Sequence, residues 1–188
     1  SMRQLAQKLR IPGLSRIEIF DNSHISGAFT VAGMVVFEDG LPCKNDYRLF
    51  KLHTENSDVD SMKEVLYRRY FRLLNEGGRF PDLLLVDGGL TQIEAAKEIL
   101  GSLDLDIPIC GLVKNDKHQT ASLMNERLEI VDVEPGSPLF FLLTRMQDEV
   151  HRFAISYHRK LRQKAQTKSI LDEIDGVGEV RKKKLMST

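Results

Sequence analysis

Two aspartates stand at the ends of stretches that have the pattern of β-strands. Asp21 ends residues 16–21, where side chains alternate with a period of two, and Asp87 ends the apolar run of residues 83–87. If the two strands are neighbours in one sheet, both carboxylates lie at the same edge. Carboxylate oxygens are the ligands that hard divalent cations prefer, so the pair predicts a metal site.

Each aspartate also has a purely structural interpretation. Asp21 could form a local turn with residues 22–23, and Asp87 could support the glycine turn at residues 88–89. For Asp87 this alternative is the weaker one, because Thr91 is placed to cap the helix that follows. An ionised carboxylate at the end of an apolar strand is also costly unless it is paired or bound to a metal.

A third ligand is expected near the start of a long helix that the sequence predicts from residue 138. Asp148, Glu149 and His151 are the candidates. Val150 belongs to the apolar stripe of this helix, and a step of about 100° puts His151 at the border of the stripe. There the imidazole would reach the edge of the sheet, although an ordinary surface or core histidine fits the same spacing.

The charges of the chain are distributed unevenly. Residues 1–150 contain 17 Lys and Arg against 23 Asp and Glu, and residues 151–188 contain 10 against 4. A positive tail favours a polyanionic partner, and a solvated basic helix face explains the same charges equally well.

The tail also contains a glycine pattern between two short predicted helices. Gly176 and Gly178 flank Val177 in the manner of a helix-hairpin-helix motif, whose backbone N–H groups bind phosphate without reading the base sequence. The positive charges of this segment come from Lys182, Lys183 and Lys184. The alternative is an ordinary helical hairpin with a glycine at the end of its first helix.

The elements that would carry these residues follow a distinctive order. Strand patterns at residues 16–21, 31–37 and 47–53 are joined by short loops and predict an antiparallel meander. Capping patterns at Ser61 and Thr91 predict the starts of two helices, each followed by a buried strand, and a hairpin and the long helix from residue 138 complete the order. The ranges of these later elements are 61–76, 83–87, 91–100, 107–113, 120–124, 127–133 and 138–161.

This order predicts an α/β fold with a mixed five-stranded sheet, three antiparallel strands and then parallel ones, flanked by helices. It is the architecture of ribonuclease H-like nucleases. The expected domains are an N-terminal arm (residues 1–15), a nuclease domain (16–165) and a short basic helical tail (166–188) that follows a hinge.

The composition excludes several classes of protein. With 188 residues, 41% hydrophobic and 29% charged, the chain is typical of globular proteins, and no apolar run approaches the roughly 18 to 20 residues of a membrane span. The two cysteines favour a reducing, cytoplasmic setting over a disulfide scaffold. Trp is absent and most Phe fall in buried patterns, which predicts no exposed aromatic surface for stacking bases.

Three segments in order carry a resemblance to a known family. Residues 17–24 (IEIFDNSH), residues 84–89 (LLVDGG) with Gln92, and residues 148–154 (DEVHRFA) are similar to the C-terminal half of UvrC, the incision subunit of bacterial nucleotide excision repair. The resemblance covers essentially the whole chain. Two other hypotheses stay open, a repair nuclease similar to endonuclease V and a non-catalytic DNA-binding scaffold.

The resemblance implies a ribonuclease H-like endonuclease that uses Mg²⁺ or Mn²⁺. Its catalytic and metal-binding triad would be Asp21, Asp87 and His151, with further candidates in Asp58, before the first helix of the domain, and Lys114, after the strand that starts near residue 107. Of the tandem helix-hairpin-helix pair that the family has, this sequence contains the first, so we expect weak DNA binding by the tail. The implied substrate is damaged double-stranded DNA, cut on the 5′ side of the lesion, and the implied partner is UvrB, with UvrA acting upstream.

Overall fold

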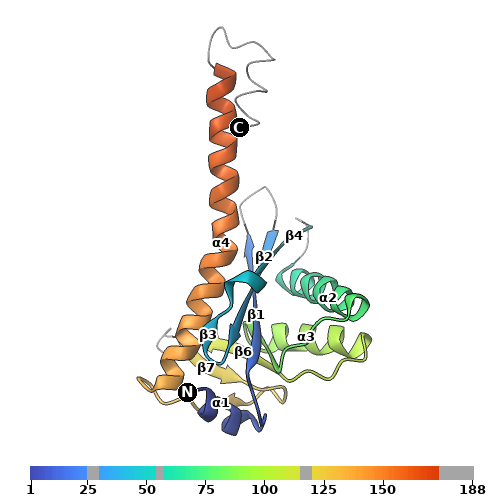
Figure 1. Cartoon of the computed structure of the whole chain (residues 1–188), viewed down its shortest axis with the longest axis vertical. Coiled ribbons are helices and arrows are strands. Elements are labelled where there is room, and N and C mark those ends of the chain that lie inside the picture. Colours follow the sequence, from blue (N-terminus) through green and yellow to red (C-terminus); the bar gives the residue numbers. More distant parts are fainter. Residues whose placement is uncertain (25–29, 54–56, 115–119, 174–188) are drawn as a thin grey trace. The chain divides into compact units, whose positions relative to one another are not determined.

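The computed structural model describes residues 1–24, 30–53, 57–114 and 120–173. The candidate DNA-binding residues Gly176, Gly178, Lys182, Lys183 and Lys184 lie outside these ranges. The elements, most of them labelled in Figure 1, are α1 (Met2–Leu9), β1 (Arg16–His24), β2 (Thr30–Glu38), β3 (Leu41–Pro42), η1 (Lys44–Asp46), β4 (Arg48–Leu52), α2 (Asp58–Glu76), β5 (Leu83–Asp87), α3 (Leu90–Ser102), β6 (Ile109–Lys114), β7 (Thr120–Met124), β8 (Ile130–Val131) and α4 (Pro138–Glu173).

The strands form one mixed sheet. Its order is β3-β2-β1-β5-β6-β7-β8, with β4 also paired to β2, which makes eight strands in the described ranges. The β1–β2 and β2–β4 pairs are antiparallel, and the β1–β5 and β5–β6 pairs are parallel. The five predicted strands are therefore present in the expected directions. The sheet is wider than predicted because β3 and the β7–β8 hairpin add to its two sides by backbone pairing.

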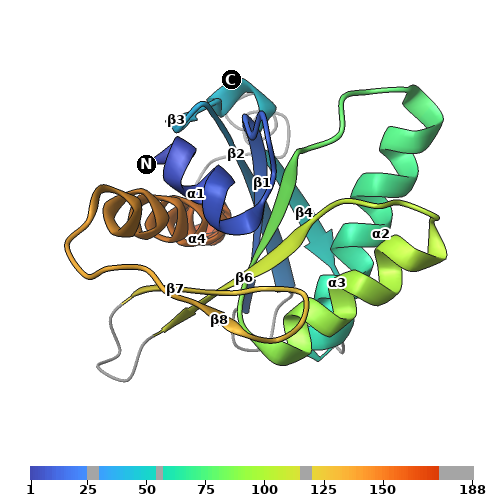
Figure 2. The ribbon, with the colours of Figure 1, turned by 90° about the horizontal axis from the view of Figure 1, so that it is seen from below.

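Alternation along the strands sends side chains to two hydrophobic cores. Ile17 and Ile19 of β1 pack toward α1 and α4, whereas Phe20 packs toward α2 and α3. Figure 2 shows the corresponding layers, with α1 and α4 on one face of the sheet and α2 and α3 on the other. Asp21 and Asp87 have the same parity as Ile19 and Leu85, so both belong to the α4 face.

Two helices begin earlier than their predicted capping residues. In α2 the cap is Ser57, whose Oγ accepts a hydrogen bond of 3.1 Å from the Asp60 backbone N–H, and Ser61 lies buried inside the helix. In α3 the N-cap is Gly89 without a side-chain bond, and Thr91 is already helical. Thr91 therefore does not cap α3, and the prediction that it does is wrong.

The long helix begins where the sequence predicts. The Ser137 Oγ accepts a hydrogen bond of 3.1 Å from the Phe140 N–H, and the predicted apolar stripe is buried from Leu139 to Val150. The sequence predicts a hinge near residue 166, but α4 continues to Glu173. The physical reason is that residues 139–173 contain neither Gly nor Pro, so nothing in this stretch breaks the helix.

The chain forms two compact units, Ser1–Ala154 and Ile155–Thr188. The first unit contains the whole sheet and the three candidate metal ligands. No helix of the described ranges has both the length and the hydropathy that crossing a bilayer requires.

Glu18 is a buried carboxylate of β1 that forms hydrogen bonds and an ion pair with α2. Its side chain is fully buried and accepts hydrogen bonds from Tyr70 Oη at 2.9 Å, Arg69 Nη2 at 3.1 Å and Arg16 Nε at 3.2 Å. Burial and the charge of Glu18 raise the pKa of Tyr70 well above its ordinary value. The hydroxyl therefore stays protonated and remains a donor to Glu18.

Candidate metal centre

Asp21, Asp87 and His151 meet on the α4 face of the sheet, near the C-terminal end of β5. Each offers one ligand atom, and these atoms all lie within 4.8 Å of one another. The parallel pairing of Phe20 with Val86 puts the two aspartates at the same level of neighbouring strands, facing α4. The structure thus brings together the three residues that the sequence proposes as the metal site.

Asp21 is the most buried of the three. Its side chain is 10% exposed, that of His151 is 62% exposed, and His151 Nδ1 lies 3.1 Å from Asp21 Oδ2. Burial, followed by the negative charge of Asp87, raises the pKa of Asp21 to about 7, and the contact with His151 opposes the rise. A cation between the two carboxylates would remove this repulsion, so the electrostatics match a cation site.

Gly33 allows α4 to come close to the carboxylates. It lies opposite Asp21 in the β1–β2 register, and a Cβ at this position would be 3.2 Å from the Cα and Cβ of Ala154. Ala154 is one turn of α4 beyond His151. A glycine at this position therefore lets the backbone of α4 approach the sheet next to Asp21. The imidazole of His151, one turn away on α4, can then reach the Asp21 carboxylate.

The other two candidates on α4 have different surroundings. Asp148 is exposed. Glu149 accepts hydrogen bonds from Arg152 Nη2 at 2.6 Å and from Tyr47 Oη at 3.2 Å. Of the three candidates on α4, His151 is thus the one whose side chain lies together with the two aspartates.

Gln147 is a residue of the site that the sequence analysis missed. Its Nε2 donates a hydrogen bond of 2.7 Å to Asp87 Oδ1. The signal that could have found it is its spacing, four residues before His151 and therefore on the same face of the helix.

Asp58 and Lys114 come from elements that neighbour the metal site. Asp58 is the first residue of α2, and its backbone carbonyl accepts a hydrogen bond of 3.2 Å from the Asn22 side chain, although its carboxylate is not in the three-residue group. Lys114 is the exposed last residue of β6, two positions beyond the residue that pairs with Asp87. Both stand at the end of the sheet that carries the aspartates.

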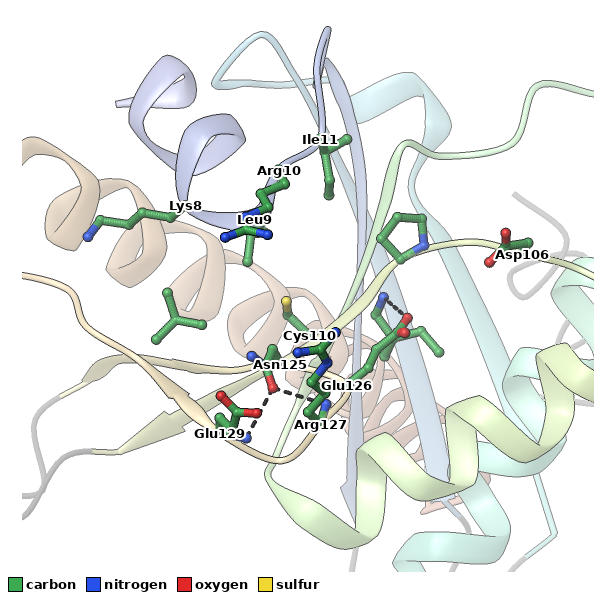
Figure 3. A pocket seen from close by; sticks show the side chains of 13 residues that line it. Lys8, Leu9, Arg10, Ile11, Asp106, Cys110, Asn125, Glu126, Arg127 and Glu129 are labelled. Atoms are coloured by element: carbon green, nitrogen blue, oxygen red, sulfur yellow. Dashed lines mark hydrogen bonds between the residues drawn. The ribbon is translucent and has the colours of Figure 1, made fainter.

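A pocket of about 470 Å³ lies at the opposite end of the strands, where β6 begins (Figure 3). Its charged side chains are Lys8, Arg10, Arg127, Asp106, Glu126 and Glu129. The charges of these six groups balance, so the pocket has no net attraction for an anion. Burial, followed by Glu126, raises the pKa of the Cys110 thiol in this pocket to about 12, which keeps the sulfur in its unreactive form.

An exposed aromatic pair on α2 contradicts the prediction that no such surface exists. The rings of Tyr67 and Phe71 stack with centroids 5.3 Å apart, and the two residues are 43% and 45% exposed. The two residues are four positions apart on one helix, so their side chains lie next to each other on the same face. The neighbouring cations Arg68 and Arg72 form ion pairs with glutamates of the same helix.

Comparisons with known proteins agree with this geometry. A family model described as the UvrC RNAse H endonuclease domain matches residues 6–155. The UvrABC system protein C of Oenococcus oeni (strain ATCC BAA-331 / PSU-1) is 49% identical over an alignment 188 residues long, which covers 99% of this chain. The chain spans 31% of the length of that relative.

Solved structures with a similar arrangement include two forms of endonuclease V. The enzyme of Ciona intestinalis, in complex with an inosine-containing 24mer DNA, is 10% identical with a TM-score of 0.48, and the match covers 85% of this chain and 97% of that one. The catalytic domain of human endonuclease V is 16% identical with a TM-score of 0.40, covering 87% and 95%. The family model covers most of the chain and the bacterial relative covers nearly all of it, so the chain belongs to the UvrC RNase H endonuclease domain family.

Proposed function

We propose that this chain is the metal-dependent endonuclease domain that makes the 5′ incision in damaged DNA during nucleotide excision repair. The observation that carries the proposal is the convergence of Asp21, Asp87 and His151 at one point on the α4 face of the sheet, in a chain of this endonuclease family. A scaffold that only binds DNA has no need to bring three possible metal ligands together from two strands and a helix.

The donor set fits a divalent cation. Asp21 and Asp87 supply carboxylate oxygens, which suit Mg²⁺, and His151 supplies an imidazole nitrogen, which makes Mn²⁺ a good substitute. When bound, the ion lowers the pKa of an attacking water and neutralises the charge that builds on the phosphate. The role of the chain is to hold the two carboxylates and the ring in place before DNA arrives.

Further residues contribute to DNA binding in this proposal. Lys114 contacts a phosphate near the metal centre, and Asp58 assists the site from the start of α2. In the tail, the helix-hairpin-helix glycines and the adjacent lysines contact the DNA backbone; these are Gly176, Gly178, Lys182, Lys183 and Lys184. The substrate is damaged double-stranded DNA in the cytoplasm, delivered by UvrB after UvrA has acted, through the full-length protein.

The test is a Mn²⁺ titration of the purified chain, followed by electron paramagnetic resonance. We expect binding by the unmodified chain and its loss in Asp21→Ala, Asp87→Ala and His151→Ala, because each removes a ligand. Asp148→Asn is the matched control, since it removes an exposed carboxylate from the same helix and should leave Mn²⁺ binding unchanged.

The same substitutions in the full-length protein should abolish 5′ incision in a system reconstituted with UvrA and UvrB. Circular dichroism checks that the variants fold. If the unmodified chain binds no Mn²⁺, or if a triad variant still makes the 5′ cut, the chain is a DNA-binding scaffold or uses other residues.

A further inference from the structure

Gln147 holds the carboxylate of Asp87 from the side of α4. The hydrogen bond from Nε2 to Asp87 Oδ1 is 2.7 Å long, and Gln147 is 8% exposed. We propose that Gln147 is a positioning residue, which fixes one orientation of the Asp87 carboxylate and so prepares it to bind the divalent ion. This inference rests on the proposed function, because it assumes that Asp87 is a metal ligand.

Two successive turns of α4 contact the two aspartates. Gln147 bonds to Asp87, and His151, four residues later on the same helix face, lies 3.1 Å from Asp21. The backbone between them is anchored by Val150, which is fully buried in the core. One rigid helix thus sets the positions of both partners, and the aspartates themselves are set by the pairing of β1 with β5.

The chemistry of an amide suits this task. An ionised carboxylate has about four lone-pair sites on its two oxygens, so one hydrogen bond leaves sites free for a metal ion. The amide carries no charge, and it therefore orients Asp87 without cancelling the negative charge that attracts the cation. An arginine or lysine in this place would compete with the ion.

Orientation in advance lowers the cost of binding. A free carboxylate loses rotational freedom when it coordinates a metal, whereas one that is already held has lost it during folding. Removal of such outer partners of metal ligands typically costs 10- to 100-fold in metal affinity or activity. A bond that only ties α4 to β5 would instead change the stability of the fold and leave the metal affinity of the folded protein intact.

The experiment compares Gln147→Met, of similar length but without a donor, with the unmodified chain. Gln147→Leu is measured in parallel, so that the result does not depend on the folding of a single variant. Thr144→Val is the matched control, because it lies one turn earlier on α4 and loses only a bond to the Phe140 carbonyl of the same helix. Mn²⁺ dissociation constants come from electron paramagnetic resonance, with circular dichroism as the measure of folding.

We expect the Mn²⁺ dissociation constant to rise about 10- to 100-fold in the Gln147 variants and to stay unchanged in Thr144→Val. In the reconstituted system, raised Mn²⁺ should restore 5′ incision by full-length protein with Gln147→Met, but not by protein with Asp87→Ala, which lacks the ligand itself. This rescue separates positioning from ligation.

Three results would overturn the inference. If both Gln147 variants bind Mn²⁺ with an affinity within twofold of the unmodified chain, Gln147 has no positioning role. If Asp87→Ala still loses binding in that case, the proposed function stands. If raised Mn²⁺ fails to restore incision by full-length protein with Gln147→Met, the positioning role is also rejected. Absence of Mn²⁺ binding by the unmodified chain overturns this inference and the proposed function together.

Discussion

Asp21 and Asp87 are carboxylates that the folded chain holds close together. The pKa of Asp21 is raised from 3.8 to about 7, so folding favours its protonated form. Between about pH 4 and pH 7 the native protein therefore binds more protons than the unfolded chain. Stability falls as the pH rises through this window, and the penalty is complete above pH 7.

We expect Asp21→Asn to stabilise the metal-free protein at pH 8, by roughly 1–3 kcal/mol, because the amide cannot acquire the unfavourable charge. The gain should shrink toward zero at pH 4, where the unmodified carboxyl is protonated in the native state. Urea unfolding in EDTA at pH 4, 6 and 8 measures the difference, and Asp148→Asn serves as the exposed control. A difference that does not vary with pH would show that folding does not raise the pKa of Asp21 as described.

The individual residues differ in how far the sequence could predict them. Asp87 ends a strand and His151 borders a helix stripe, and the structure brings both together with Asp21. Asp21 was predicted to end its strand, but β1 continues to His24 because residues 22–24 also pair with β2. Gln147 has a weaker signal, its spacing of four residues before His151, because a polar residue at the border of a stripe is common. The burial of Glu18 could not be predicted either, since its partners Arg69 and Tyr70 are 51 and 52 residues away in the chain.

At the scale of elements, the contact between β2 and α4 determines how near the imidazole comes to the sheet. Gly33 and Ala154 form this contact, opposite Asp21 on one side and one turn from His151 on the other. Any side chain on Gly33 has to push the helix outward by a few tenths of an ångström. The three ligands would then separate although none of them has changed.

We expect Gly33→Ala to weaken Mn²⁺ binding by about tenfold, with a change in stability of only about 1 kcal/mol, because crowding and the reduced freedom of the unfolded chain oppose each other. Gly101→Ala is the matched control, since a Cβ there meets nothing within 4 Å and helix propensity should add up to about 1 kcal/mol of stability. Mn²⁺ titration and urea unfolding provide the two measurements. Unchanged Mn²⁺ affinity in Gly33→Ala would mean that α4 can yield without moving His151.

Element boundaries were harder to predict than element types. The strands and helices occur in the predicted order, but Ser61 and Thr91 lie inside helices that begin at Asp58 and Leu90. A capping pattern shows only that a residue could cap, and for α2 the nearby Ser57 takes this role. The hairpin β7–β8 was predicted, whereas its pairing with β6 depends on the tertiary arrangement.

At the scale of the whole molecule, charge separates the acidic first 150 residues from the basic remainder. If the tail lysines contact phosphates, the simultaneous replacement of Lys182, Lys183 and Lys184 by Ala should weaken DNA binding. It should also flatten the slope of log affinity against log salt by roughly two to three. Fluorescence anisotropy at several salt concentrations measures the slope.

A matched triple variant provides the control for the tail lysines. Replacement of Arg3, Lys8 and Arg10, which are exposed cations at the α1 end of the chain, removes the same charge and should leave the slope nearly unchanged. Equal slopes in the tail variant and the unmodified chain would reject the phosphate contacts.

We also expect this chain alone, with Mg²⁺, to cut lesion-bearing duplex DNA poorly. Its acidic part repels DNA, and a catalytic site without substrate positioning forgoes much of the rate that orientation supplies. Gel assays of the chain alone and of the full-length protein with UvrA and UvrB compare the two. Efficient cleavage at lesions by the chain alone would place damage recognition within these residues.

The contact between His151 and Asp21 joins residues 130 positions apart, and the helix that supplies the imidazole is the last described element of the chain. Synthesis at about 5–20 residues per second puts roughly 6 to 26 seconds between the two residues. Asp87 is also made within that interval, so a nascent chain has both carboxylates before it has the imidazole. The order of translation therefore completes the proposed metal centre only after all the described strands of the sheet have been made.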